Sequence, residues 1–424
     1  MRMIRLYIFI FGLAVLSACQ DQNYWVVDFP EFETSDKLIL QSTSLPIDKR
    51  IAIEGIYRVV KGASEFGDTI VVKVTRDRIS FFGNKQGIFS IVETGIYSQS
   101  ILLEGYWRQI LTDKTGLIRL FVDQSTSILN DIPTSVITIT GLYSFNSGEP
   151  NNQIQFERIE SFTETLLNDK FLIVAHRGGG RNSDFHPYSE NSIEMINYSE
   201  YLGATGVEID VYITKDDVPV VYHDAELNVR SIQKSPLMGK IADYTYSQLR
   251  TYVELLHGEE IPKLDDALKF ILEETSLRLV WLDIKDFKTI DNAIILQKKY
   301  NDKITGSGRD LSVYIGIPDE NTYNYVLAKP DYDRIATLCE LDIDKVIAAN
   351  SKIWAPPFSN GYQSNKVIEM HNNGVLCIPW TVDYPKHIAL YTSFGSSIEN
   401  NRFDGILTDY PTILAYYHYV RHND

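Results

Sequence analysis

Eight ionisable side chains occur in pairs at the ends of, or within, four short apolar runs of the sequence. Charged groups at such positions are costly in a protein core unless opposite charges or a metal ion compensate them. Histidine exchanges a proton near neutral pH, carboxylates bind hard cations, and arginine and lysine bind anions. The set therefore indicates acid–base chemistry, with a metal ion, at an anionic centre. Its members are His176 with Arg177, Glu208 with Asp210, His223 with Asp224, and Asp283 with Lys285.

Glu208 and Asp210 are two residues apart in the strand-like run "GVEIDV", so their side chains point to the same face. Asp283 and Lys285 repeat this spacing in "WLDIK". Three inward carboxylates near one rim predict a site for one divalent cation, Ca²⁺ or Mg²⁺ with Mn²⁺ as a third option, rather than for zinc. For any single residue, a salt bridge with Arg177 or Lys285 is the alternative interpretation.

The elements that must position these residues lie in a segment from 166 to 424, where apolar runs alternate with helix-like segments. This alternation predicts a TIM-type (β/α)8 barrel, in which catalytic groups lie at the carboxyl ends of the strands. Nine runs compete for eight strand positions, so one is accessory. They are "FLIVAH", "GVEIDVYIT", "VPVVYH", "LRLVWLDIK", "SVYIGIP", "IATLCE", "KIWAPPF", "VLCIPWTV" and "FDGILTD".

Residues 19 to 165 have a different pattern, with eight short β-branched and aromatic runs separated by turn residues such as "EFGD" and "NSGEPNNQ". Helical periodicity is nearly absent. The pattern predicts an all-β antiparallel barrel or sandwich, and an up-and-down barrel fits the number of runs. No motif in this segment suggests a chemical activity.

The whole chain has 424 residues and a net charge of −16, with 44% hydrophobic and 23% charged residues. Its length suggests two domains. Its charge has the wrong sign for binding a phosphate backbone, so nucleic acid is not an expected partner. A small phosphate ester is still possible as a ligand, because a bound metal or a few cations can reverse the local field.

The N-terminus reads as an export signal, because Arg2 and Arg5 precede an apolar run from Leu6 to Leu16 that is too short to span a membrane. The residues "LSAC" that end at Cys19 resemble a bacterial lipobox. We expect residues 1–18 to be a lipoprotein signal peptide and Cys19 to be lipidated. The protein would then be exported and anchored to a membrane surface, on the periplasmic or the cell-surface face.

Seven sequence blocks, taken in order, resemble the glycerophosphodiester phosphodiesterase family, which belongs to the phosphatidylinositol phospholipase C-like α/β barrel superfamily. The resemblance covers residues 171 to 411 and leaves the first 165 residues unmatched. The blocks are "AHRGG" (175–179), "EN" (190–191), "GVEIDVYITKDDVPVVYHD" (206–224), "IPKLDDAL" (261–268), "WLDIK" (281–285), "PWTVD" (379–383) and "FDGILTDYP" (403–411).

The resemblance implies a metal-dependent α/β barrel that cleaves glycerophosphodiesters, which are small molecules, to glycerol 3-phosphate and an alcohol. It makes His176 and His223 the acid/base pair, and it assigns phosphate oxygens to Arg177 and Lys285. The metal ligands would be Glu208, Asp210 and Asp283, of which Asp283 stands where the family usually has glutamate. Residues of a second shell or a substrate-specific rim would be Glu190, Asn191, Asp224, Arg181, His186 and Trp380.

Two alternatives stay open from the sequence. One keeps the same mechanism on intact phospholipids, with phospholipase D-like or C-like chemistry. The other is a non-catalytic barrel with a β domain that binds glycans or lipids. The oligomeric state is not determined by the sequence.

Overall fold

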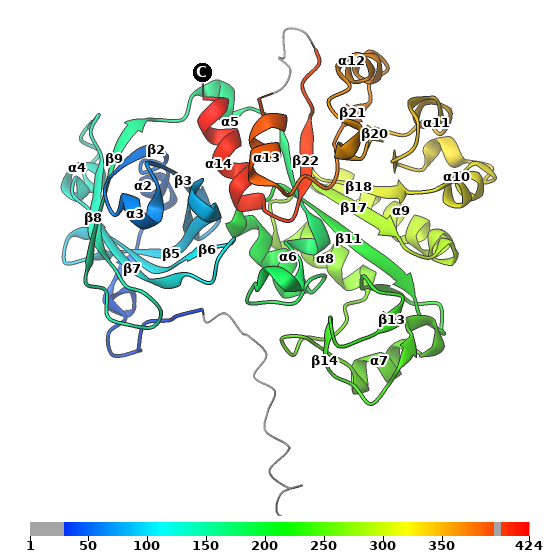
Figure 1. Cartoon of the computed structure of the whole chain (residues 1–424), viewed down its shortest axis with the longest axis horizontal. Helices are drawn as coiled ribbons and strands as arrows, with labels where there is room; N and C mark the ends of the chain where they lie inside the picture. The colour runs from blue at the N-terminus through cyan, green and yellow to red at the C-terminus, as the bar shows by residue number, and fades with distance from the viewer. Residues whose placement is uncertain (1–28, 394–399, 424) are drawn as a thin grey trace, which may run out of the picture.

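The computed structural model describes residues 29–393 and 400–423, so the predicted signal peptide and Cys19 lie outside the described residues (Figure 1). Two bodies stand side by side. A β-barrel is formed by strands between residues 43 and 160, and an α/β barrel by the longer remainder of the described chain. No helix in the described ranges has both the length and the apolar character to cross a membrane.

The first body is a closed antiparallel barrel, which excludes the sandwich. Each strand pairs with the next, and the last pairs with the first. Alternation places Tyr57, Phe81, Trp107 and Phe156 in its interior. Its strands are β2 (Gly55–Lys61), β3 (Thr69–Thr75), β4 (Arg78–Gly83), β5 (Ile88–Tyr97), β6 (Ser100–Gln109), β7 (Thr115–Val122), β8 (Thr138–Tyr143) and β9 (Asn152–Glu160), with β1 (Thr43–Ser44) beside β5 and short helices α2 (Ile47–Ile51), α3 (Ala63–Phe66) and α4 (Ser125–Leu129).

The second body is a nearly closed barrel of parallel strands, in the order β21-β20-β19-β18-β17-β11-β10-β22. Backbone hydrogen bonds from Asp404 N–H to Cys377 O (2.9 Å) and from Leu407 N–H to Pro379 O (3.0 Å) join the two outer strands of that order. The strands are β10 (Leu172–Ala175), β11 (Gly206–Ile213), β17 (Leu279–Ile284), β18 (Ser312–Ile317), β19 (Thr337–Cys339), β20 (Ile353–Trp354), β21 (Leu376–Cys377) and β22 (Gly405–Thr408).

The accessory run is "VPVVYH", whose strand β12 (Pro219–Val221) pairs antiparallel with β11. Only residues 214–218 separate the two strands, which is enough for a hairpin, whereas a parallel crossover needs a dozen or more residues. From the sequence we expected His223 and Asp224 to end a parallel strand. This expectation was wrong, because they follow the antiparallel strand β12. The hairpin returns them to the barrel mouth, where Tyr222 N–H donates to Asp210 O at 3.0 Å.

Helices lie around the outside of the parallel strands, and an excursion formed by residues 225–260 extends from the carboxyl end of β11, at the lower right of Figure 1. The helices are α5 (Glu164–Leu167), α6 (Ile193–Ser199), α8 (Leu264–Glu274), α9 (Ile290–Ser307), α10 (Glu320–Leu327), α11 (Ile343–Ala348), α12 (Ser364–Asn372), α13 (Pro385–Tyr391) and α14 (Pro411–Arg421). The excursion contains β13 (Glu226–Leu227), β14 (Ile232–Lys234), β15 (Gly239–Lys240), α7 (Tyr246–Tyr252) and β16 (Glu254–Leu255).

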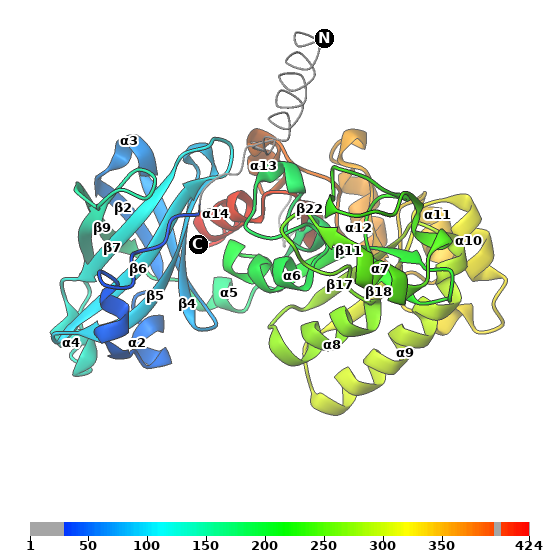
Figure 2. The same cartoon turned by 90° about the horizontal axis from the view of Figure 1, so that it is seen from below.

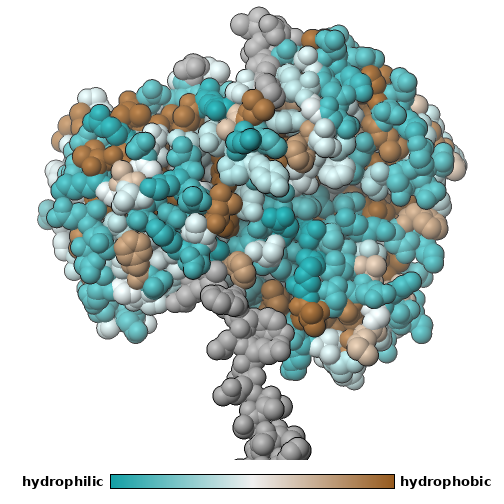
Figure 3. Space-filling model, viewed as in Figure 1, coloured by the Kyte–Doolittle hydropathy of each residue, from teal (hydrophilic) through white to brown (hydrophobic). Residues whose placement is uncertain are grey.

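The two bodies share an apolar interface. Phe82, Phe89 and Ile91 on the outer wall of the β-barrel belong to the same buried cluster as Ile413 and Leu414 of α14. Figure 2 shows α14 between the two barrels. On the face shown in Figure 3, hydrophobic residues lie in small separate groups among hydrophilic ones. Because one buried cluster contains residues of both bodies, the interface continues the core of the α/β barrel onto the outer wall of the β-barrel.

Candidate active site

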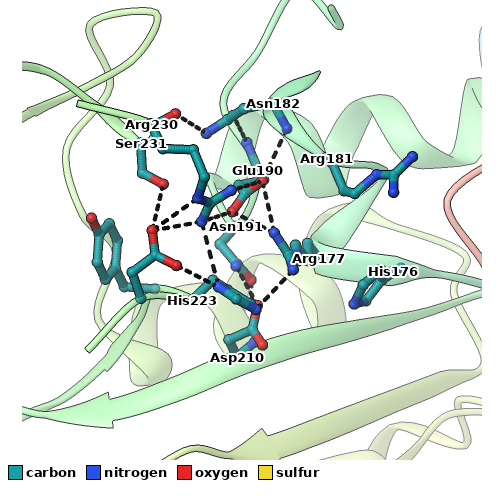
Figure 4. Close-up of polar contacts among 12 residues, drawn as sticks. His176, Arg177, Arg181, Asn182, Glu190, Asn191, Asp210, His223, Arg230 and Ser231 are labelled. Atoms are coloured by element: carbon teal, nitrogen blue, oxygen red, sulfur yellow. Dashed lines mark hydrogen bonds and ion pairs between the residues drawn. The ribbon is translucent and has the colours of Figure 1, made fainter. Parts of the chain in front are cut away.

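Arg177 adopts a left-handed backbone conformation, with φ of 51°, directly after β10 and His176. Few non-glycine residues do so, and they concentrate at functional sites. Two hydrogen bonds hold the bend. The Arg177 N–H donates to Oε2 of Glu208 at 2.8 Å, and the Asn191 N–H donates to the Arg177 carbonyl at 2.8 Å. The bend turns the Arg177 guanidinium toward His223 (Figure 4).

The glycines after Arg177 are required by packing as well as by backbone freedom. Gly178 has φ of 79°. A Cβ atom at Gly179 would lie 2.3 Å from Met195, and one at Gly180 would lie 2.5 Å from Nε2 of His186. His186 is buried against this bend and only 3% exposed, so it does not stand on the rim.

Both ring nitrogens of His176 face carboxylates. Nδ1 lies 2.6 Å from Oδ1 of Asp409, and Nε2 lies 3.8 Å from Oε2 of Glu208. Burial alone would lower the pKa of His176, but the hydrogen bond to Asp409 and the charge of Glu208 outweigh it and raise this pKa to about 9. Burial acts against ionisation of Asp409 too, yet the hydrogen bond with His176 lowers its pKa to about 2. This arrangement favours an imidazolium.

His223 has different hydrogen-bond partners. Nη2 of Arg177 lies 2.8 Å from Nε2 of His223, and an arginine can only donate, so this ring nitrogen accepts and carries no proton. Nδ1 lies 2.7 Å from Oδ1 of Asp224 and, at the longer distance of 3.4 Å, from Nη2 of Arg230. The shorter contact places the proton on Nδ1, which donates to Asp224. Asp224 is held in turn by Nε of Arg230 at 2.9 Å and by the amide of Asn228 at 2.8 Å. His223 therefore presents Nε2 to the site as a hydrogen-bond acceptor (Figure 4).

Glu190 supports the arginines around the two histidines. It accepts from Nη1 of Arg177 at 3.1 Å and from Nη2 of Arg230 at 2.8 Å, and the Asn182 N–H donates to it at 2.9 Å. Asn191, the next residue, donates from its amide to Oδ2 of Asp210 at 2.7 Å. Glu190 thus fixes the position of the Arg177 guanidinium, and Asn191 orients the Asp210 carboxylate.

The three predicted metal ligands come together. Oxygen atoms of Glu208, Asp210 and Asp283 lie within 4.8 Å of one another, and Asp210 and Asp283 are register partners on β11 and β17. Glu208 and Asp210 are buried. Burial, followed by the charge of Asp210, raises the pKa of Glu208 to about 8. Oε1 of Glu208 has no hydrogen-bond donor in the described part of the chain. These carboxylates therefore fit a divalent cation in donor type and in unbalanced charge.

Lys285 neutralises part of this charge. Its Nζ lies 2.9 Å from Oδ1 of Asp210 and 2.5 Å from Oδ2 of Asp283. Burial would lower the pKa of Lys285, but these two carboxylates hold it above its ordinary value. The salt-bridge interpretation thus fits Asp210 and Asp283, while Glu208 is not covered by it. A cavity of about 290 Å³, lined by Lys285, Tyr212 and Phe287 among others, opens next to this lysine.

Arg181 and Trp380 lie in different surroundings. Nε of Arg181 is 3.0 Å from Oδ2 of Asp409, and its Nη2 donates to Oδ1 of Asp184 at 3.1 Å. Arg181 is thus attached to the carboxylate that holds His176. Trp380 packs in the barrel interior and donates from Nε1 to the Ala355 carbonyl at 2.8 Å.

Three residues of the site were not singled out from the sequence. Asp409 directly follows β22, so the rule that catalytic groups follow strand ends could have found it. Asp383 accepts from the Asp409 N–H at 2.9 Å, and burial and Asp409 raise its pKa to about 7. Arg230 lies in the excursion, where no periodic pattern or motif marks it.

The site as a whole offers a proton acceptor at His223, a proton donor at His176, a guanidinium between them and a group of carboxylates below. Hydrolysis of a phosphodiester uses these elements, because the attacking oxygen loses a proton, the leaving oxygen gains one, and the phosphate oxygens carry negative charge.

Comparison with known proteins finds a matching family model and relatives with the corresponding name. The model of the glycerophosphoryl diester phosphodiesterase family matches residues 176–413. A glycerophosphodiester phosphodiesterase from Caldanaerobacter subterraneus subsp. tengcongensis is 26% identical over 258 residues, covering 58% of this chain and 96% of that protein. Glycerophosphodiester phosphodiesterase 1 from Mus musculus is 38% identical over 135 residues, covering 30% of this chain and 38% of that protein.

Two solved structures that match this chain are also of proteins named glycerophosphodiester phosphodiesterase. A glycerophosphodiester phosphodiesterase from Parabacteroides distasonis is 21% identical with a TM-score of 0.45, over 60% of this chain and 98% of that one. One from Thermotoga maritima is 20% identical with a TM-score of 0.43, over 58% and 97%. Because the family model begins at His176 and spans more than half of the sequence, the chain belongs to the glycerophosphoryl diester phosphodiesterase family.

Proposed function

We propose that this protein hydrolyses glycerophosphodiesters to glycerol 3-phosphate and an alcohol, with His223 as base and His176 as acid. The observation that carries the proposal is the opposite hydrogen bonding of the two rings. Nε2 of His223 accepts from Arg177, while both nitrogens of His176 face carboxylates. One ring is ready to take a proton and the other to give one.

Arg177 would hold the phosphate between them. It presents a planar fork that suits two phosphate oxygens, although Glu190 and His223 are its partners in this structure. Lys285 would contribute a point charge from the other side. A divalent cation held by Glu208, Asp210 and Asp283 would supply further positive charge at the phosphate oxygens.

The attacking oxygen is either water or a hydroxyl of the substrate's own glycerol, and the second route passes through a cyclic phosphate. Product analysis in ¹⁸O-labelled water, stopped early, separates the two. A cyclic product that appears first and then decays supports the second route, and its absence at every time point supports attack by water.

A panel of glycerophosphocholine, glycerophosphoethanolamine and glycerophosphoinositol tests the proposal directly. Chelator-treated protein should be inactive and should recover with Ca²⁺, Mg²⁺ or Mn²⁺. His176→Ala and His223→Ala should each reduce kcat by about a hundredfold or more while the protein stays folded. Normal turnover in both variants would exclude the proposed roles.

Intact phospholipids are a second candidate substrate. Val229 and Met238, on the excursion that carries Arg230, are 79% and 81% exposed. Apolar side chains so exposed on the segment that follows His223 in the sequence would suit contact with acyl chains. Release of head groups from liposomes, compared with turnover of the water-soluble panel, decides between the two substrates.

We also propose that the protein is an exported lipoprotein attached to the membrane through Cys19. The sequence "LSAC" and the preceding apolar run support this. Cys19→Ser should move the protein from the membrane fraction to the soluble fraction and abolish incorporation of labelled fatty acid. Unchanged fractionation would refute the anchor.

A further inference from the structure

Arg108 is an arginine of the β-barrel domain that is buried against the catalytic domain. It lies on β6, where its neighbour Trp107 faces the interior of the β-barrel. Because side chains alternate along a strand, Arg108 points outward from the β-barrel, toward the α/β barrel. It is 1% exposed.

The contacts of Arg108 leave much of its guanidinium unsatisfied. Nη2 donates to the carbonyl of Asp184 at 3.1 Å, and the guanidinium lies over the ring of Phe29 at 5.2 Å. Nε and Nη1 are buried without a hydrogen-bond partner in the described part of the chain. A buried cation with so few hydrogen-bond partners is energetically costly. Proteins retain such unfavourable arrangements mainly at functional or strained sites.

Asp184 belongs to the loop of residues 181–191, which touches both sides of the active site. Through Arg181, the beginning of the loop reaches Oδ2 of Asp409 at 3.0 Å, and Asp184 itself accepts from Arg181 at 3.1 Å. At the end of the loop, Glu190 holds Arg177 and Asn191 holds Asp210. Arg108 therefore contacts this loop between its two functional ends.

We propose that Arg108 is a positioning residue for the active site. By holding the Asp184 carbonyl it fixes the 181–191 loop, and with it Arg181, Glu190 and Asn191. The β-barrel domain is then a structural support of the active site and not only an attached module. The kinetic part of this inference rests on the proposed function, whereas the anchoring of the loop does not.

The test replaces Arg108 in the full chain with methionine, which keeps the apolar stem and removes the charge and the hydrogen bonds. We expect kcat/KM on the best substrate of the panel to fall by about tenfold to a hundredfold, because small displacements of positioning groups have effects of this size. Hydrogen–deuterium exchange of peptides from residues 181–191, measured without substrate, should become faster.

Two further variants separate positioning from general domain adhesion. Arg108→Lys keeps a positive charge and a hydrogen-bond donor on a side chain one atom shorter, and it should retain more activity and more protection from exchange than Arg108→Met. Arg76→Met removes another arginine between the domains, which donates to Asn197 at 2.6 Å and lies 3.2 Å from Glu200, with no contact to the 181–191 loop. Arg76→Met should change neither kcat/KM nor the hydrogen–deuterium exchange of residues 181–191.

Unchanged exchange and unchanged kcat/KM in Arg108→Met would overturn the proposal, and so would equal losses in Arg76→Met. If Arg108→Met does not fold, Arg108→Gln, whose shorter side chain does not reach Asp184, carries the same expectations. A wild-type protein without activity on the panel would refute the proposed function alone, because the exchange experiment still decides whether Arg108 anchors the loop.

Discussion

Nδ1 of His176 and Oδ1 of Asp409 lie 2.6 Å apart, although these two residues are 233 positions apart in the sequence. His176 follows the first parallel strand of the barrel and Asp409 follows the last, and β10 and β22 are paired in register from Leu172 with Gly405 to Ala175 with Thr408. The parallel pairing of the first strand with the last therefore creates this pair. A carboxylate at Nδ1 orients the ring and stabilises its protonated form.

Asp409→Asn should reduce kcat by about a hundredfold or more, because the amide keeps the shape of the carboxylate but not the charge that stabilises the imidazolium. Steady-state kinetics at neutral pH measure this, and circular dichroism and the melting temperature establish that the variant is folded.

A matched control is Asp404→Asn. Asp404 accepts from Nε2 of His371 at 2.8 Å, immediately before β22 and so at the opposite end of that strand. The same chemical change is made there away from the site, so kcat should stay at the wild-type level. Equal kcat values in the two variants would show that Asp409 has no special role.

The sequence predicted the parallel barrel and its carboxylates because both depend on local pattern. Glu208 and Asp210 share a face by strand geometry alone. Arg230 could not be found in this way, since it reaches Glu190 only through a long excursion without periodicity. His186 looked like a polar loop residue, and only the packing against Gly180 shows that it is buried.

Arg177→Lys should reduce kcat/KM by about tenfold or more, because a lysine is a point charge and cannot replace a planar fork. In the structure, Nη1 of Arg177 contacts Glu190 while Nη2 contacts His223. The control is Arg278→Lys, since Nη1 and Nη2 of Arg278 bridge the carbonyls of Lys170 and Phe171 before β10, at the other end of the barrel. Similar losses of kcat/KM in both variants would contradict a specific role for the Arg177 fork.

Glu208→Gln should weaken the affinity for a divalent cation by at least about tenfold, because affinity depends on the number of charged ligands. Calorimetric titration of chelator-treated protein with Ca²⁺, Mg²⁺ and Mn²⁺ measures this without an activity assay. Asp286→Asn is the control, because Asp286 is near Lys285 but accepts from the Lys288 N–H and lies outside the carboxylate group. Equal affinities of wild type and Glu208→Gln would exclude Glu208 as a ligand.

Acid should destabilise the protein through two buried histidines, His186 and His418, which are 3% and 5% exposed. Burial lowers the pKa of each to about 3, and the charge of Arg108 adds to the effect at His186. The unfolded chain binds these protons near pH 6.5, so between about pH 6.5 and pH 3 the unfolded state holds more protons than the folded one. Stability is therefore lost as pH falls, by up to about 1.4 kcal/mol per pH unit for each histidine.

Urea unfolding at pH 7, 6 and 5 measures this dependence, and His186→Gln and His418→Gln should each make it shallower because the amide does not titrate. His371→Gln should act in the opposite direction. The hydrogen bond from His371 to Asp404 raises the pKa of this histidine, so its contribution to stability is present at low pH and is lost as pH rises. Removing it should make the loss of stability steeper between pH 7 and about pH 6 and should leave the slope at lower pH unchanged, because below about pH 6 His371 is protonated in both states. A single slope shared by all three variants and the wild type would show that none of these histidines controls the acid sensitivity.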